Sequence, residues 1–362
     1  MTTMNGALNS DWQVFLRARG ARAGAESADV ETFGDPAAER LAASEGAVLC
    51  DLSHLGVIGF AGSDAQVFLQ GQLTCDVREA STRASRPGAL CTPKGRALAT
   101  FRLWQDADGY CMQLPVGQLE PIRKRLSMYV LRSKVSVSDR SGQSVRIGVA
   151  GPQAGARLAA ALGAAPEALP TAGAIVQAHG MQWLSLDGGR FELVVQPDAA
   201  ADLWTTLAAT ITPAGEPAWR WAAIHAGEAT LHEATREQFV PQMIDLDLTG
   251  GIGFSKGCYT GQEIVARTQY LGRLKQRLYR AHIAGAEPLP APGTALCSAD
   301  LEGQATGMVV ESAWAPAGGI DLLAVVRTES AAVHPLHLSA IDGPLLQSLV
   351  PVHPEAVSDG AR

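Results

Sequence analysis

The chain has 362 residues, which at roughly 150 residues per domain corresponds to two or three domains. Apolar residues make up 47% of it and charged residues 18%, a balance that supplies a large core and excludes wholesale disorder. The formal net charge of −7 argues against a general nucleic-acid-binding protein but leaves room for local basic surfaces.

Two basic stretches stand out against the acidic background. Between Arg78 and Lys134 there are eleven Lys and Arg against four Asp and Glu, and between Lys256 and Arg280 there are six against one. A charge run of this kind is more often an ordinary solvated surface. The alternative is a surface for a local anionic partner.

The cysteine spacing and the termini bear on metal binding and location. None of the six cysteines forms a C-x-x-C pair, so no zinc or thioredoxin-like spacing is present, and a chain of this size does not need disulfides. The N-terminus lacks the basic and apolar segments of a secretory signal, and no apolar run approaches a span of roughly 18 residues. We expect a cytoplasmic protein without a metal site or a membrane partner.

The first third of the chain begins with a segment of weak pattern. Residues 18–48 are rich in Ala and Gly, and residues 1–45 are expected to form a variable lead-in. Residues 57–60 then predict a short strand, and Ser63 or Asp64 can cap a helix that runs to Gln70. Val67 and Phe68 are the expected buried positions of that helix.

Two later segments repeat one pattern of turn, strand and amphipathic helix. Residues 106–115 run into a helical pattern over 121–130, and residues 187–197 run into another over 201–207. Between them, Val145, Ile147 and Val149 alternate as in a strand. The pattern predicts an α+β fold with two antiparallel-sheet and helix lobes over residues 46–272.

The residue pattern of the sequence changes after about Leu278. Gly and Pro punctuate short apolar runs there, which predicts a small C-terminal β-barrel over residues 275–350. Residues 351–362 are expected to form a frayed tail.

The stretch Lys256-Gly-Cys-Tyr-Thr-Gly-Gln-Glu263 is the most informative in the chain. Thr260 and Glu263 have the spacing of a capping box and so predict a helix N-terminus. The positive end of that helix and the nearby Lys256 would both favour a thiolate at Cys258. A lone cysteine is more often a buried structural residue, but the lysine, the two glycines and the cap together favour a functional one.

This stretch resembles the signature of YgfZ-type proteins, and so do residues 68–77, 93–96 and 239–242. The resemblance extends from about Val48 to the barrel. It implies three domains in a ring around a tetrahydrofolate pocket, on the scaffold of the aminomethyltransferase of glycine cleavage, the T-protein. It also implies a role in the assembly or repair of iron–sulfur clusters, serving enzymes such as those that modify tRNA.

The resemblance also implies a set of site residues. Cys258 would be the functional residue and Lys256 the residue that tunes it. Contacts to folate are expected from eight residues, namely Leu55, Thr100, Met112, His225, Tyr259, Gln262, Glu263 and Arg267. The basic stretches would then steer the anionic tail of a polyglutamylated folate towards the pocket.

Departures from the T-protein bear on the reaction. Leu55 stands where the T-protein has Met, an apolar exchange of similar volume. Ala99 and Thr100 stand where it has a pair of Asp, so a general acid or base is missing there. His225 replaces its pterin-binding Glu, which removes the paired acceptors of a carboxylate, although a satisfied core histidine explains His225 equally well.

Three functions remain open at this point. The first is a folate-binding accessory protein whose clients are iron–sulfur proteins, with Cys258 in the functional role. The second is a folate-dependent aminomethyltransferase or demethylase, against which the missing Asp pair argues. The third is a non-catalytic adaptor that binds tRNA or a protein, such as a tRNA-modifying enzyme, through its basic face.

Overall fold

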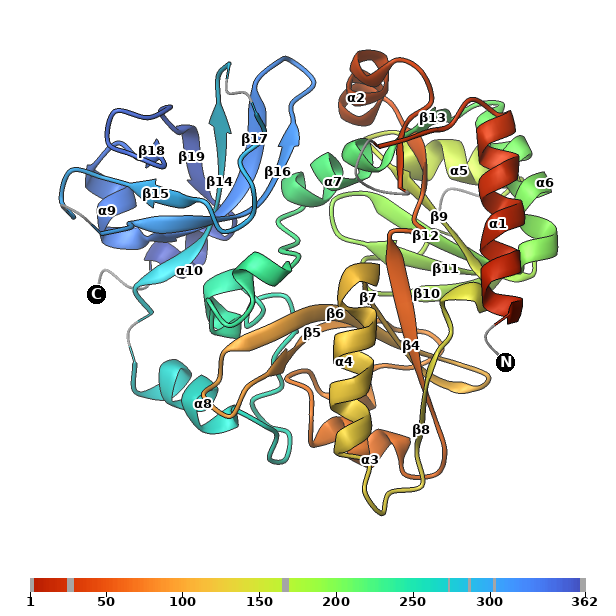
Figure 1. The fold of residues 1–362 in the computed structure, drawn as a ribbon, viewed down its shortest axis with the longest axis horizontal. Helices are drawn as coiled ribbons and strands as arrows, with labels where there is room; N and C mark the ends of the chain where they lie inside the picture. Colours follow the sequence, from red (N-terminus) through yellow and green to blue (C-terminus); the bar gives the residue numbers. More distant parts are fainter. Residues whose placement is uncertain are drawn as a thin grey trace.

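The computed structural model describes residues 3–24, 29–164, 169–272, 274–285, 288–301 and 304–358. Two α+β lobes and a curled C-terminal sheet are grouped about a common centre (Figure 1). The α+β fold class and the two antiparallel lobes predicted from the sequence are therefore confirmed. Within the described residues, no helix is long and apolar enough to cross a membrane.

The first lobe has a six-stranded sheet in the order β10-β11-β12-β9-β3-β13. Its strands are β3 (Val48–Asp51), β9 (Val145–Ala150), β10 (Ile175–Ala178), β11 (Met181–Leu186), β12 (Arg190–Val195) and β13 (Thr212–Ala214). Its helices are α1 (Thr3–Ala18), α2 (Pro36–Glu45), α5 (Ala154–Leu162), α6 (Pro197–Ala208) and α7 (Glu216–His225), and a short ribbon is formed by β1 (Arg22–Ala23) and β2 (Val30–Thr32). All pairings in the six-stranded sheet are antiparallel except β3 with β13.

Strand β9 is buried on both faces, which the sequence pattern did not indicate. Val145, Ile147 and Val149 belong to the core beneath α1, α5 and α6, as their alternation predicts. The opposite face of β9 carries Arg146 and Gly148, and a side chain at Gly148 would collide with Trp219 of α7. This second face is covered by α7 and by the second lobe, so it is buried as well.

The second lobe has a five-stranded antiparallel sheet in the order β5-β6-β7-β4-β8. Its strands are β4 (Leu55–Ala61), β5 (Arg86–Cys91), β6 (Ala97–Asp106), β7 (Gly109–Pro115) and β8 (Ser136–Asp139). Its helices are α3 (Ala65–Gln70), α4 (Val116–Met128) and α8 (Gln262–Tyr270), with short 3-10 turns at η1 (Val77–Glu79), η2 (Ser141–Gln143), η4 (Glu233–Thr235) and η5 (Pro241–Ile244). The two strand-to-helix units foreseen from the sequence are β7 with α4 and β12 with α6.

Helix α3 differs from the prediction in two details. Phe68 is buried as expected, but Val67 is 77% exposed, because this six-residue helix buries one stripe made of Ala65, Phe68 and Leu69. No side chain caps its N-terminus, since the Asp64 carboxylate accepts the backbone N–H of Lys134 instead.

The C-terminal sheet has six strands in the order β18-β15-β16-β17-β14-β19 and curls as a half-barrel. Its strands are β14 (Gln276–Ile283), β15 (Ala295–Cys297), β16 (Gly307–Trp314), β17 (Ile320–Arg327), β18 (His337–Leu338) and β19 (Gln347–Pro351), and α9 (Thr328–Val333) and α10 (Pro354–Ser358) accompany them.

Both ends of the chain hold more structure than their composition suggested. In the expected lead-in, Trp12 and Leu16 of α1 are buried in the core of the first lobe. In the expected tail, Val352 donates its backbone N–H to Leu278, and a side chain at Gly227 would collide with the Val352 side chain. The last four residues of that tail, 359–362, lie outside the described part of the chain.

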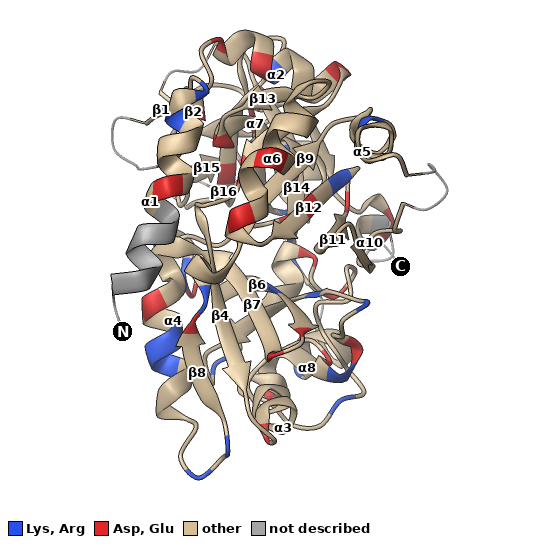
Figure 2. Ribbon diagram, turned by 90° about the vertical axis from the view of Figure 1, so that its right-hand side faces the viewer, with Lys and Arg blue, Asp and Glu red and all other residues tan. Residues whose placement is uncertain are grey.

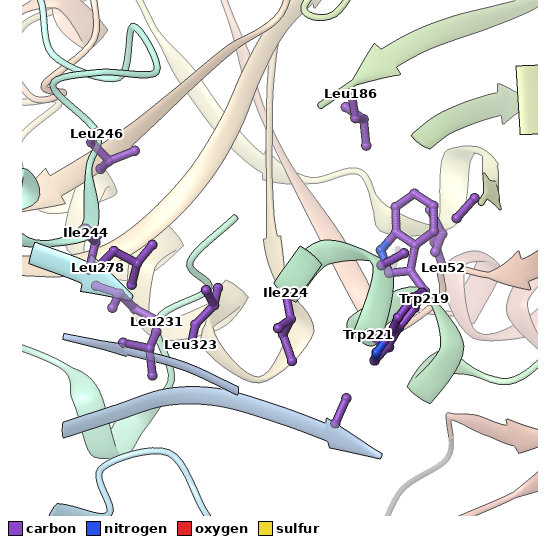
Figure 3. Close-up of a cluster of buried hydrophobic side chains, with 14 of the residues drawn as sticks. Leu52, Leu186, Trp219, Trp221, Ile224, Leu231, Ile244, Leu246, Leu278 and Leu323 are labelled. Carbon is purple, nitrogen blue, oxygen red and sulfur yellow. The ribbon is translucent and has the colours of Figure 1, made fainter. Parts of the chain in front are cut away.

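Helix α7 joins the first lobe to the C-terminal sheet. It contacts β3 and β9 on one side and β16 and β17 on the other (Figure 1). A continuous apolar cluster follows it from Leu52 and Trp219 through Ile224 to Leu278 and Leu323 (Figure 3). The three parts therefore share one core, and a cavity where they meet has fixed walls.

A pair of substitutions in α3 tests this account of its packing. Leu69 is fully buried, so Leu69→Ala should lower the free energy of unfolding by about 2–5 kcal/mol through the cavity that it leaves. Val67→Ala, two residues away, should change it by no more than about 0.5 kcal/mol. Urea denaturation of the two variants measures both values, and equal losses would contradict the assigned face.

Candidate functional site

A cavity of about 420 Å³ lies where the two lobes meet the segment between α7 and α8. Much of its wall is apolar, with Leu55, Phe101, Leu114, Ile244, Leu246 and Leu248. Its polar groups come from Thr100, Arg102, Gln113, Asp187, Glu228, Thr230, Thr249 and His353. An apolar cavity with a few convergent polar groups is typical of a site for a small organic molecule, and we call it the central cavity.

Glu228 is the electrostatic centre of this cavity. Arg190 donates to its Oε2 at 2.5 Å and Arg102 donates to the same oxygen at 3.4 Å. Both arginines are almost fully buried, whereas the Glu228 side chain is 39% exposed. Burial alone would raise the pKa of the Glu228 carboxyl, but the two guanidinium groups outweigh it and lower this pKa to about 2.

The second oxygen of Glu228 is available to a ligand. Both arginines bond to Oε2, and no described residue donates a hydrogen bond to Oε1. Glu228 therefore presents an ionised acceptor in a partly apolar cavity, where a hydrogen bond from a ligand is charge-assisted.

A glycine turn aims Glu228 into the cavity. Helix α7 ends at His225, Gly227 follows with φ +72°, and the backbone N–H of Glu228 returns to the carbonyl of Ala223. A side chain at Gly227 would lie 2.3 Å from Val352, so the turn also seats the C-terminal segment. The sequence analysis missed Glu228, although an acidic residue directly after a helix-ending glycine is a usable signal.

His225 lies on the opposite side of this helix end and does not line the central cavity. Its Nε2 is 2.8 Å from Oδ2 of Asp321 in β17, and Trp221 donates to the same oxygen. His282 pairs with Oδ1 of Asp321 at 2.8 Å. His225 thus helps to fasten α7 to the C-terminal sheet.

The other residues expected to contact folate divide into three groups. Leu55 and Thr100 line the central cavity, where the Thr100 hydroxyl accepts the backbone N–H of Leu231 at 3.1 Å. Met112 is fully buried in the apolar core of the second lobe. The remaining four lie in or next to α8 and do not line the cavity, namely Tyr259, Gln262, Glu263 and Arg267.

Lys256 points into the protein. Its Nζ donates to the carbonyl oxygens of Leu73 and Cys75, each at 2.6 Å, and lies 5.0 Å from the centre of the Tyr259 ring. Burial lowers the pKa of Lys256 to about 8. No hydrogen bond or ion pair joins Lys256 to Cys258 in the described structure, so this ammonium group fastens the loop to the second lobe.

The signature loop, residues 256–261, ends differently from the prediction. The N-cap of α8 is Gly261, with φ +87°, and no side chain caps the helix, so the predicted capping box of Thr260 and Glu263 is wrong. The physical reason is that Gly261 packs closely against the turn that follows β5. A β-carbon at Gly261 would lie 2.5 Å from the carbonyl oxygen of Thr92 in that turn. Cys258 precedes this turn and is exposed.

Sequence motifs that are far apart in the chain meet at this loop. Thr260 donates its backbone N–H to Gly71, and a β-carbon at Gly95 would touch Ile264 of α8. Arg96 donates to the carbonyl of Gln238 at 2.6 Å. The loop itself is held by Lys256 and Thr260, which bond to residues 71–75, and by the close approach of Gly261 to Thr92.

The basic stretches do not surround the central cavity. Figure 2 shows basic residues on α4 and in the loop that leads from α4 to β8. Arg102 is the one Lys or Arg of the 78–134 stretch that lines the cavity. Arg123 and Lys124 of α4 both pair with Glu120. Arg273, in the second stretch, lies outside the described residues.

The structure holds no disulfide and offers no cluster of metal ligands among its described residues. All six cysteines are free, and Cys258 is the exposed one. No group of three or more His, Cys, Asp or Glu side chains in the described part is placed to hold a metal ion.

Comparison with known proteins identifies the family. Residues 29–249 match the GCVT N-terminal domain family. The tRNA-modifying protein YgfZ of Vibrio vulnificus is 32% identical over 247 residues, which cover 68% of this chain and 72% of that protein. The chain belongs to the YgfZ family. The tRNA-modifying protein YgfZ of Escherichia coli is 33% identical over 250 residues, which cover 68% and 74% of the two chains.

A solved structure shows how this YgfZ-family fold relates to the T-protein. Aminomethyltransferase T of the glycine cleavage system from Bartonella henselae superposes with a TM-score of 0.74 over 93% of this chain and 96% of that one. The two sequences are 20% identical, so the likeness shows the fold alone. The predicted T-protein-like scaffold is confirmed.

Two glycines of the signature loop give a matched test of its geometry. Gly261→Ala forces a left-handed residue and a collision with Thr92, so it should lower the free energy of unfolding by about 1–3 kcal/mol. Gly257→Ala meets no atom within 4 Å and should have little effect. Thermal unfolding of both variants measures the difference, and equal stabilities would refute the loop geometry.

The charge on Glu228 should give a pH-dependent contribution to stability. Its pKa in the folded protein is about 2, below its ordinary value of 4.5, so the contribution is complete above about pH 5 and is lost as the pH falls towards 2. Glu228→Gln should cost about 1–2 kcal/mol at pH 7, a range reduced for the exposure of this side chain. Urea unfolding between pH 7 and pH 3 should show the gap from wild type closing, and a constant gap would contradict the account.

Proposed function

We propose that this chain supports tRNA modification as a folate-binding accessory protein, with tetrahydrofolate or a derivative in the central cavity and iron–sulfur proteins as clients. Its relatives carry the name of tRNA-modifying proteins, and its fold is that of an aminomethyltransferase. The observation that carries the proposal is the central cavity, with its apolar walls and the free oxygen of Glu228.

The residues of the cavity fit the chemistry of a folate. A pterin ring carries N–H donors, for which Oε1 of Glu228 and the Gln113 side chain are suitable partners, while the flat rings suit walls such as Leu55 and Phe101. When bound, tetrahydrofolate carries one-carbon units on its ring nitrogens.

The aminomethyltransferase alternative receives less support from the same cavity. Ala99 and Thr100 have no carboxylate. Ala99 is buried, and the Thr100 hydroxyl already accepts a backbone hydrogen bond. Glu228 is a carboxylate in the right cavity, but a pKa of about 2 makes it a weak base at neutral pH. Asp187 and His353 also line the cavity, but neither stands at the position of the missing Asp pair, which Ala99 and Thr100 occupy.

The RNA-adaptor alternative also receives less support. The expected anchor residues Arg123 and Lys124 share Glu120, which neutralises part of the basic face of α4. The overall charge of −7 adds long-range repulsion for a polyanion. We therefore place the link to tRNA in the client enzymes and not in direct binding.

Cys258 would act on a partner and not on the bound folate. It is exposed, it does not line the central cavity, and the loop that carries it is fastened by Lys256 and Gly261. A fixed and accessible thiol suits contact with another protein. Lys256 in this proposal positions the loop.

The first test is calorimetric titration with tetrahydrofolate under anaerobic conditions, where wild type should show saturable binding. Leu248 lines the cavity and is 39% exposed, so Leu248→Trp should obstruct the cavity and weaken binding about tenfold or more. Leu271→Trp, at a site that is 85% exposed, should bind as wild type does, and so should Glu263→Gln. Unchanged binding by Leu248→Trp would place the folate elsewhere, and no binding to wild type would refute the folate proposal.

The second test concerns Cys258. In a bacterial strain that lacks its own YgfZ-family gene, the wild-type chain should restore tRNA thiolation by cluster-dependent enzymes, measured by mass spectrometry of tRNA nucleosides. Cys258→Ser should abolish most of that rescue, while Cys297→Ser, at a half-buried cysteine of β15, should retain it. Full rescue by Cys258→Ser would remove the thiol from the mechanism.

A further inference from the structure

A second cavity, of about 580 Å³, opens between the two lobes and shares no lining residue with the central cavity. We call it the lateral cavity. Its walls come from β4, β6 and β7 of the second lobe and from β9 to β12 of the first. The wall is polar, with glutamine side chains from both lobes, and its volume is in the range of sites for small molecules.

Arg146 of β9 lies in the wall of this cavity and is 95% buried, with 5% of its surface exposed. One guanidinium nitrogen, Nη2, donates to the backbone carbonyl of Leu55. The other two nitrogens, Nε and Nη1, have no hydrogen-bond partner among the described residues. A guanidinium normally uses its donors, so two nitrogens without a partner at a buried position are unusual.

The carboxylates near Arg146 are already engaged. The carboxylates whose charge acts on Arg146 are those of Glu192, Asp51 and Asp139, yet none of the three forms an ion pair with it within 4 Å. Asp139 accepts the backbone N–H of Ser141. Glu192 accepts the Gln113 amide at 2.5 Å, and Asp51 accepts N–H and O–H groups from the Trp12, Gln13 and Ser53 side chains. Arg146 is therefore a buried cation without a direct counterion, which is a costly arrangement unless an anion completes it.

The other arginine of the lateral cavity does not share this property. Arg140 donates to Asp106 at 2.7 Å and to Asp108 at 3.1 Å, so its single positive charge is engaged by two carboxylates. Trp104 and Gln182 are bonded to each other across the wall. Gln177 and Gln196 are exposed at the rim. The hydrogen-bond donors without a partner in this cavity thus belong to Arg146, and the two exposed glutamines supply uncharged polar contacts.

We propose that the lateral cavity binds a small polar metabolite through a carboxylate or phosphate group seated on the Nε and Nη1 side of Arg146. The planar fork of a guanidinium matches two oxygens of either oxyanion. The glutamines of the wall would contact the uncharged remainder of the ligand. This site is separate from the proposed folate site and does not depend on it.

The test is calorimetric titration of the full chain at low ionic strength, with inorganic phosphate and with succinate in separate experiments. Saturable binding of one probe is expected, and the probe that binds identifies the oxyanion. Arg146→Gln should abolish the heat of binding. If neither probe binds to wild type at about 50 mM, the proposal is overturned.

A rim variant keeps the test decisive if Arg146→Gln fails to fold. The double substitution Gln177→Glu with Gln196→Glu places two negative charges on exposed positions at the mouth and should weaken binding at least about fivefold. Gln347→Glu, on the exposed edge strand β19, adds a charge far from this cavity and should leave binding unchanged. Equal affinity of the rim variant and wild type would overturn the proposal.

Tetrahydrofolate titration of the same rim variant separates the two proposed sites. Because no residue lines both cavities, its affinity for folate should equal that of wild type. A parallel loss of folate and oxyanion binding would mean that the two cavities are one site, which would also overturn the proposal.

Discussion

A layer of buried charge between the two lobes is the constraint on which the site depends. Arg190 and Arg102 meet at Glu228, and Glu192 lies near Arg146 in the same interface. Burying charges is costly, so the layer is tolerable only while each group keeps its partners in place. This requirement fixes the distance between the lobes more strictly than apolar contacts would, and both cavities form at the two ends of the layer.

The layer also explains why the scaffold of an aminomethyltransferase need not perform its reaction. The guanidinium groups that organise the cavity hold Glu228 in its ionised form, which suits recognition of N–H donors and does not suit proton transfer. In the function that we propose, reactivity would be left to Cys258, which is exposed and does not line the cavity. Binding and reaction would then belong to separate parts of the chain, which suits an accessory protein that senses or carries one molecule while it serves another.

The sequence predicted the α+β lobes and the two strand-to-helix units, because these follow from local periodicity, and it predicted the T-protein-like scaffold from a specific eight-residue match. The predictions failed where contacts between residues far apart in the sequence determine the local structure. The spacing of Thr260 and Glu263 is right for a cap, but the contact of Gly261 with Thr92 determines the turn. Likewise Glu228, and not His225, enters the cavity, since a turn seated on distant Val352 sets its direction. The unpaired N–H donors of Arg146 cannot be predicted from a local sequence pattern, because they depend on which distant residues surround the side chain.

The close contact between Val352 and Gly227 has a consequence for the design of fusion proteins. The last described strand, β19, crosses back to the turn that carries Glu228, and His353 lines the central cavity. The two ends of the chain are therefore not equivalent as attachment points. An affinity tag or a fluorescent protein attached after the C-terminal segment would lie next to the wall of the central cavity, whereas a fusion at the other end would be joined to α1, which packs on the first lobe. Reporter fusions meant to leave the central cavity undisturbed belong at the N-terminus.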